Sequence, residues 1–181
     1  GTLNALADQH GGNVAALQPA ILEALRAVLT AGRSETRQRF MAGGTGDACV
    51  AEYSYLLDRM LATLADVAQA KVFPGDTSKA QERLAIAAVG GYGRTEMAPQ
   101  SDVDLLFLLP EHHTPRVQQI VEFILYLMWD LSLKLGHAVR SVDECITNAR
   151  QDLTIRTSLM ESRFLWGDRS LCDALQRRFR K

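Results

Sequence analysis

Residues 84–110 read LAIAAVGGYGRTEMAPQSDVDLLFLLP. Two short apolar runs flank a segment that is dense in glycine, proline and charge, which is typical of two strands joined by an irregular connection. Gly90 and Gly91 end the first run, and Asp102 and Asp104 open the second. A single aspartate there would be an ordinary turn residue, but two aspartates around one valine need a further reason.

The two aspartates are expected to point in the same direction. Residues two apart in a strand project to one face, so Asp102 and Asp104 lie roughly 7 Å apart along the backbone. Neighbouring carboxylates repel each other, and near an apolar sheet this repulsion destabilises the fold. A divalent cation removes that cost, and oxygen ligands on a rigid strand suit Mg²⁺. The pair therefore predicts a metal site.

The glycines predict an anion site beside it. Gly90 and Gly91 carry no side chains, so their backbone N–H groups can approach a ligand closely. A glycine turn that leads into a short helical turn forms an anion-binding concavity, and Arg94 could hold a phosphate oxygen. The ligand that needs both an anion cradle and a cation is a metal-bound nucleoside triphosphate.

Around this stretch, hydrophobic spacing predicts a small sheet backed by helices. Strands are expected at 84–89, 103–109 and 137–142. Three helices are expected in the first part of the chain: 17–31, ended by Gly32; from an N-cap at Asp47 to just before Pro74; and from Thr114 to about 135, ended by Gly136. Three more are expected after the third strand: one that begins at an Asp143 N-cap, one from about 152 to 166, and one after Asp168. This order lacks the regular alternation of a doubly wound fold, so we expect an α+β protein.

Bulk composition excludes several classes of function. The 181 residues carry a net charge of −1, which disfavours a nucleic-acid partner or an anionic membrane surface. The apolar run 123–129 near the middle is far too short to span a bilayer. Three scattered cysteines form no CxxC pair, which disfavours a zinc site or a disulfide framework and favours the cytoplasm.

The spacing of the motif resembles that of a known superfamily. Gly-Gly, ten intervening residues and Asp-x-Asp within apolar sequence resemble the signature of the DNA polymerase β-like nucleotidyltransferases. The segment GGYGRTEMAPQSDVDLLFLLP, with WDLSLKLGHAVRS downstream, resembles the amino-terminal catalytic domain of the bifunctional uridylyltransferase/uridylyl-removing enzymes, which modify the PII nitrogen-signalling protein. The similarity extends from about residue 33 to the end of the chain.

This resemblance implies a fold, a reaction and roles for particular residues. The fold would be a small mixed β-sheet of the nucleotidyltransferase type, flanked by helices and with extra helices at both ends. The reaction would transfer UMP from UTP to a PII tyrosine and release pyrophosphate, with Mg²⁺, or alternatively Mn²⁺, as cofactor. The implied catalytic and metal-binding residues are Asp102 and Asp104, and the implied nucleotide-binding residues are Gly90, Gly91, Arg94 and Ser101.

The expected organisation has three segments in one compact unit. Residues 1–76 would form a helical segment that packs on the catalytic domain, 77–142 the nucleotidyltransferase core, and 143–181 a carboxyl-terminal helical segment. Gly1 stands where a full chain would have Met, so we expect a piece of a longer protein.

Two features depart from the pattern of the superfamily and the family. Members of the superfamily often carry a third carboxylate on a later strand, but 137–142 contains no acid, and Asp143 is the nearest candidate although a capping role is equally plausible. The uridylyl-removing activity of the family resides in a domain with a His-Asp pair, and no His-Asp dipeptide occurs here. We therefore expect transfer without removal.

Several alternatives stay open. The domain could be a catalytically silent nucleotide-binding regulatory module, or a nucleotidyltransferase with another donor or acceptor. Ser101 could be a local backbone cap instead of a triphosphate contact. Four further residues have either a structural or a site role: Tyr92, Glu96, His137 and Arg140.

Overall fold

The computed structural model describes residues 2–10 and 13–179, which form two units that are described separately. The first unit contains the chain up to residue 75 together with 95–101 and 119–134. The second contains 76–94, 102–118 and the chain from 135 onward. Each unit is assembled from separate stretches, so these boundaries differ from the predicted segments, whose outermost residues 1, 180 and 181 lie outside the described range.

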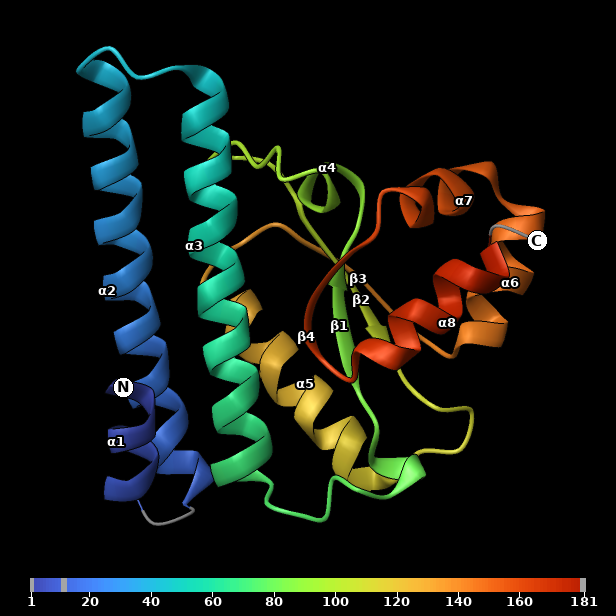
Figure 1. Ribbon diagram of the computed structural model, residues 1–181. Helices are drawn as coiled ribbons and strands as arrows, with labels where there is room; N and C mark the ends of the chain where they lie inside the picture. The colour runs from blue at the N-terminus through green and yellow to red at the C-terminus, as the bar shows by residue number, and fades with distance from the viewer. Residues whose placement is uncertain (1, 11–12, 180–181) are drawn as a thin grey trace. The chain divides into compact units, whose positions relative to one another are not determined.

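The first unit is helical. Its elements are α1 (Thr2–Gln9), α2 (Val14–Met41), α3 (Gly46–Val67), a π-helical turn (Ala68–Val72) and most of α5 (Pro115–Asp130). Helices α2 and α3 lie side by side and are joined by a short turn (Figure 1). The buried residues Leu17, Ile21, Leu25 and Leu29 recur every four positions along α2, as expected for a helix with one apolar face.

Helix α2 also has the length and composition of a segment that could cross a membrane. Long core helices of soluble proteins pass the same test, so this is weak evidence. The expectation of no membrane partner stays a prediction.

Two predicted helix boundaries in this unit are wrong. Gly32 does not end the first helix, which continues to Met41. A Cβ at this glycine would collide with Cδ2 of Leu56 on α3, so the glycine permits close helix packing. Asp47 lies in the first turn of α3, and the side chain of Thr45 caps that helix by accepting the N–H of Ala48.

The second unit is built on a four-stranded mixed sheet. Its strands are β1 (Ala85–Ala88), β2 (Val103–Leu108), β3 (Leu135–Arg140) and β4 (Arg163–Gly167), in the order β3-β2-β1-β4. Strand β1 pairs antiparallel with both β2 and β4, whereas β2 and β3 are parallel. The remaining elements are a 3₁₀ turn (Ala80–Glu82), α4 (Gly90–Gly93), the start of α5, α6 (Val142–Gln151), α7 (Leu153–Met160) and α8 (Arg169–Phe179).

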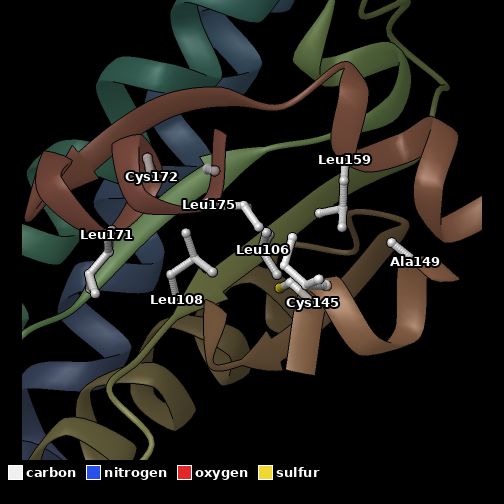
Figure 2. Packing of buried hydrophobic residues seen from close by; sticks show 11 residues of the cluster. Leu106, Leu108, Cys145, Ala149, Leu159, Leu171, Cys172 and Leu175 are labelled. Atoms are coloured by element: carbon white, nitrogen blue, oxygen red, sulfur yellow. The ribbon is translucent and has the colours of Figure 1, made fainter. Parts of the chain in front are cut away.

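Helices α6, α7 and α8 cover one face of this sheet. Figure 2 shows Leu106 and Leu108 of β2 among side chains of the three helices, in one buried cluster. The cluster comprises Ala85, Ala87, Leu106, Leu108, Cys145, Ile146, Ala149, Leu159, Leu171, Cys172 and Leu175. Residues at even positions of β2 therefore face these helices, and Asp104 stands at the start of that row.

The carboxyl-terminal part of the chain differs from the prediction. Residues 152–166 do not form one helix: Asp152 caps α7, which ends at Met160, and β4 follows. Asp143 is not an N-cap, because Ser141 caps α6 in a reciprocal capping box with Glu144. The helix expected after Asp168 is confirmed as α8.

The boundary between α5 and β3 is also shifted. Helix α5 ends at Asp130, and Ser132 adopts a left-handed conformation with φ 57°. The chain then enters β3 at Leu135, so Gly136 lies inside a strand and does not end a helix. Strand β3 spans 135–140 instead of 137–142 because the chain turns five residues earlier than expected.

The predicted fold class is confirmed. The protein is α+β, with a small mixed sheet flanked by helices and further helices at both ends of the described chain. The strands expected at 84–89 and 103–109 are present with slightly shorter bounds.

Candidate nucleotide and metal site

The glycine stretch forms a tight helical turn at the end of β1. Gly90 has φ +58°, a conformation that favours glycine. The turn α4 closes through the N–H of Gly93, which donates to the carbonyl of Val89 at 3.0 Å. Its N-cap residue, Val89, makes no side-chain capping hydrogen bond. The N–H groups of a first helical turn have no partner within the helix, so they are suited to an anion.

Asp104 lies directly beside this turn. Its carbonyl accepts the N–H of Val89 at 3.0 Å, which fixes the start of β2 against the end of β1. Its Oδ2 lies 3.3 Å from the position that a Cβ on Gly90 would take. Its register partner on β3 is Gly136, where a Cβ would overlap Oδ1 of Asp104. Two glycines thus leave the space that the carboxylate occupies.

Asp102 contributes the second negative charge. It is exposed and immediately precedes β2. Partial burial of Asp104, followed by the charge of Asp102, raises the pKa of the Asp104 carboxyl above its usual value. The pair therefore has the electrostatic strain that the sequence predicted. This donor set fits a hard divalent cation, which would relieve the repulsion.

The described part of the chain offers no third acidic ligand to complete the pair. Among the described residues, no group of three His, Cys, Asp or Glu side chains is arranged to hold a metal ion. Asp143 lies in the first turn of α6 and forms an ion pair with Arg178. It lines a different cavity from the one that contains Asp104. On β3, the position opposite Asp104 is Gly136, where Asp104 itself leaves no room for a side chain.

A cavity of about 310 Å³ adjoins Asp104. It lies between the β2–β3 side of the sheet and α7, and its polar lining includes Asp104, His137, Arg140, Thr154 and Ser158. A cavity of this size is at the lower end of the range for small-molecule sites. Both His137 and Arg140 therefore line the candidate site, as the sequence allowed.

Arg94 and Ser101 have different surroundings. The Nη1 of Arg94 pairs with Oε1 of Glu161 at 2.7 Å, next to the glycine turn. Ser101 belongs to the first unit, is exposed, and donates its backbone N–H to the carbonyl of Ala98 at 3.0 Å. The nucleotide contacts predicted for both residues stay predictions.

Tyr92 anchors the glycine turn in the core. Its side chain is completely buried, and the guanidinium of Arg163 lies 5.5 Å from the centre of its ring. This agrees with the structural reading of Tyr92. Glu96 is exposed and belongs to the first unit.

Sequence reasoning missed three residues that shape this site. Gly136 was interpreted as a helix end, although its place opposite Asp104 follows from the parallel register. Glu161, directly after α7, pairs with Arg94 beside the glycine turn. Arg163 contacts that turn from the start of β4, a strand that was not predicted. The only available signal was that the stretch ESRFLWGD lies within the segment of family resemblance.

Comparison with known proteins identifies the motif. Residues 75–164 match the family model of the nucleotidyltransferase domain. The chain is 51% identical over 177 residues to the bifunctional uridylyltransferase/uridylyl-removing enzyme of Azospirillum brasilense, which covers 98% of this chain and 19% of that protein. Its identity to the enzyme of that name from Rhodospirillum rubrum is 51% over 160 residues, which are 88% of this chain and 17% of that protein. Its identity to the enzyme from Erythrobacter litoralis is 43% over 178 residues, which are 98% of this chain and 19% of that protein. The chain thus spans about a fifth of the length of these curated relatives.

Proposed function

Because residues 75–164 belong to the nucleotidyltransferase domain family, we propose that this chain transfers UMP from UTP to a tyrosine of the PII protein and releases pyrophosphate. The family accounts for a nucleoside triphosphate donor. The uridylyl group is taken from the name of the relatives, and the PII tyrosine from the resemblance of the motif segments. The observation that carries the proposal is the Asp104 carboxylate, which lies beside both Asp102 and the glycine turn.

Asp102 and Asp104 would hold one or two Mg²⁺ ions, and Mn²⁺ would serve as well. When bound, the metal neutralises the triphosphate and lowers the pKa of the acceptor hydroxyl. The raised pKa of Asp104 supports this role, because a carboxylate that is costly to ionise gains most from a cation.

The glycine turn and Arg94 would bind the β- and γ-phosphates. The N–H groups at the start of α4 supply donors without a side chain in the way. The tyrosine oxygen attacks the α-phosphorus in line, the bond to the β-phosphate oxygen breaks, and the phenolic proton passes to solvent. The chain supplies mainly placement and charge neutralisation.

The same proposal covers partners and location. The chain would act in the cytoplasm without nucleic acid or membrane, in keeping with its net charge of −1 and its three cysteines, all free. It would not remove uridylyl groups, since the resemblance assigns that activity to a separate domain.

The decisive experiment is transfer of label from α-labelled UTP or ATP to PII in the presence of Mg²⁺. We expect label from UTP and not from ATP, and a loss of about 10³-fold in rate for Asp102→Asn or Asp104→Asn. Glu23→Gln removes an exposed carboxylate in the first unit and serves as the control.

Other outcomes point to the alternatives. Label from ATP, or onto another protein, would support a transferase with a different donor or acceptor. Nucleotide binding without transfer, unchanged in both Asn variants, would support a silent regulatory module. Release of UMP from modified PII by this chain would contradict the absence of removal activity.

A further inference from the structure

The segment between α7 and β4 presses against the glycine turn. At Gly93, a Cβ would overlap the carbonyl oxygen of Glu161, so the two backbones are in direct contact. Arg163, two residues further on, donates from Nε to the carbonyl of Gly93 and from Nη2 to the carbonyl of Tyr92, both at 3.2 Å. The last turn of α4 is therefore held by another part of the chain.

Arg163 also contacts the aromatic ring of Tyr92, a residue of the turn. Its guanidinium lies 5.5 Å from the centre of the Tyr92 ring, within the range of a cation–π contact. The flat guanidinium can meet two carbonyls and a ring at once, which the ammonium of a lysine cannot reproduce. This single side chain thus restricts both the backbone and the core side chain of the turn.

Glu161 orients the cation at the end of the turn. Its Oε1 lies 2.7 Å from Nη1 of Arg94. The other terminal nitrogen, Nη2 of Arg94, lies 3.8 Å from the position that a Cβ on Gly91 would occupy. Glu161 thus holds Nη1, and Nη2 lies near the backbone of Gly91 in the turn.

We propose that Glu161 and Arg163 are positioning residues for polyphosphate binding: Arg163 sets the shape of the glycine turn, and Glu161 holds Arg94 over it. This inference rests on the proposed function, because it assumes that the turn and Arg94 bind the phosphates of a nucleoside triphosphate. Neither residue needs to touch the nucleotide.

Glu161 has two opposing effects on polyphosphate binding: its charge repels the ligand, and its ion pair restrains Arg94. Its negative charge repels a polyphosphate, but both partners are partly exposed, at 45% for Arg94 and 26% for Glu161, so solvent screens that repulsion. Without this ion pair, the arginine side chain has one restraint fewer and must lose more rotamer freedom on binding, which costs affinity. We therefore expect removal of Glu161 to weaken binding despite the removal of a negative charge.

The test is calorimetric titration of Mg·UTP, and separately of Mg·pyrophosphate, into the whole chain. We expect Glu161→Ala to raise Kd for both ligands about tenfold. In an Arg94→Ala background, the same substitution should have no further effect, because its action passes through Arg94. Arg156→Ala removes an exposed cation from α7 that takes no part in the contacts described above, and it should leave Kd unchanged.

Arg163 requires a variant that keeps the fold. Arg163→Lys retains the charge but cannot reproduce the paired donation, so Kd for Mg·UTP should rise while the thermal midpoint stays within a few degrees of the parent. A lower midpoint with unchanged Kd would reduce Arg163 to a structural role and overturn its part of the proposal.

The outcomes separate the two levels of argument. If the parent chain binds neither ligand, the proposed function fails and this inference fails with it. If the parent binds and Arg94→Ala weakens binding, but Glu161→Ala has no effect or tightens it, only the inference on Glu161 is overturned. A loss on Glu161→Ala that persists in the Arg94→Ala background overturns it as well.

Discussion

At the scale of single residues, Asp104 combines a cost in stability with a proposed catalytic role. Burial and the charge of Asp102 raise its pKa, so the folded state binds a proton at this carboxyl more tightly than the unfolded state does. Stability is then lost as pH rises from the unfolded pKa through the folded pKa.

The first prediction follows from that sign. Asp104→Asn should be at least as stable as the parent at pH 7, measured by thermal melting, because the costly charge is gone. Its transfer activity should fall about 10³-fold. Mg²⁺ should raise the melting temperature of the parent and not of the variant. A variant that melts well below the parent at neutral pH would show that the carboxylate stabilises the fold, contrary to this argument.

Gly136 gives a second test at this scale. In Gly136→Ala the new Cβ would overlap Oδ1 of Asp104, so the carboxylate must leave its present position. Transfer activity and Mg²⁺-induced stabilisation should both fall, although the substitution leaves both aspartates in the chain. Gly46→Ala is the matched control, because nothing lies within 4 Å of its Cβ position. Full activity in Gly136→Ala would mean that the position of this carboxylate is not critical.

At the scale of elements, the capping box of α6 links strand β3 to the helices that cover the sheet. Ser141 Oγ accepts the N–H of Glu144 at 3.2 Å, and Glu144 Oε2 accepts the N–H of Ser141 at 2.7 Å. Ser141→Ala removes one half of this exchange at a residue that is 7% exposed. The free energy of unfolding should fall by about 1 kcal/mol in a denaturant titration.

The control for that substitution is in the same helix. Thr147→Ala replaces an exposed interior residue of α6, where alanine is the better helix former. It should leave the stability unchanged or slightly higher. Equal losses in the two variants would show that the effect is not one of capping.

Local sequence predicted the central elements well and the peripheral ones less well. The two strands of the motif are apolar, short and bounded by glycine, proline and aspartate, so their positions follow from local chemistry. Strand β4 follows α7 closely and pairs with β1, about eighty residues earlier in the chain. That pairing depends on tertiary contacts, and local patterning does not contain it.

The candidate site divides in the same way. The charge pair and the tight glycine turn could be predicted from sequence spacing and residue type, although Asp102 immediately precedes β2 and so lies outside the strand. The space that Gly90 and Gly136 leave for the Asp104 carboxylate could not be predicted, because it depends on which residue of β3 pairs with Asp104 in the parallel register. The roles of Glu161 and Arg163 could not be predicted for a similar reason, since these residues contact the turn from about seventy residues away in the sequence.

At the scale of the whole molecule, the reactivity of the three cysteines can be followed separately in the two units. Cys49 is half-buried in the first unit, whereas Cys145 and Cys172 are buried in the core cluster of the second. Burial raises the pKa of both core thiols to about 11. At pH 8 they carry on the order of a hundredfold less reactive thiolate than ordinary thiols, and reagents cannot reach them.

A thiol-specific reagent at pH 8 should therefore modify Cys49 first, and peptide mass spectrometry should identify it. In rising denaturant, Cys145 and Cys172 should become reactive together, because α6 and α8 bury them against the same strands of the sheet. The midpoint of their exposure then measures the stability of the second unit, independently of Cys49. Fast labelling of either core cysteine in the native protein, or exposure of one well before the other, would contradict a single cooperative core around the candidate site.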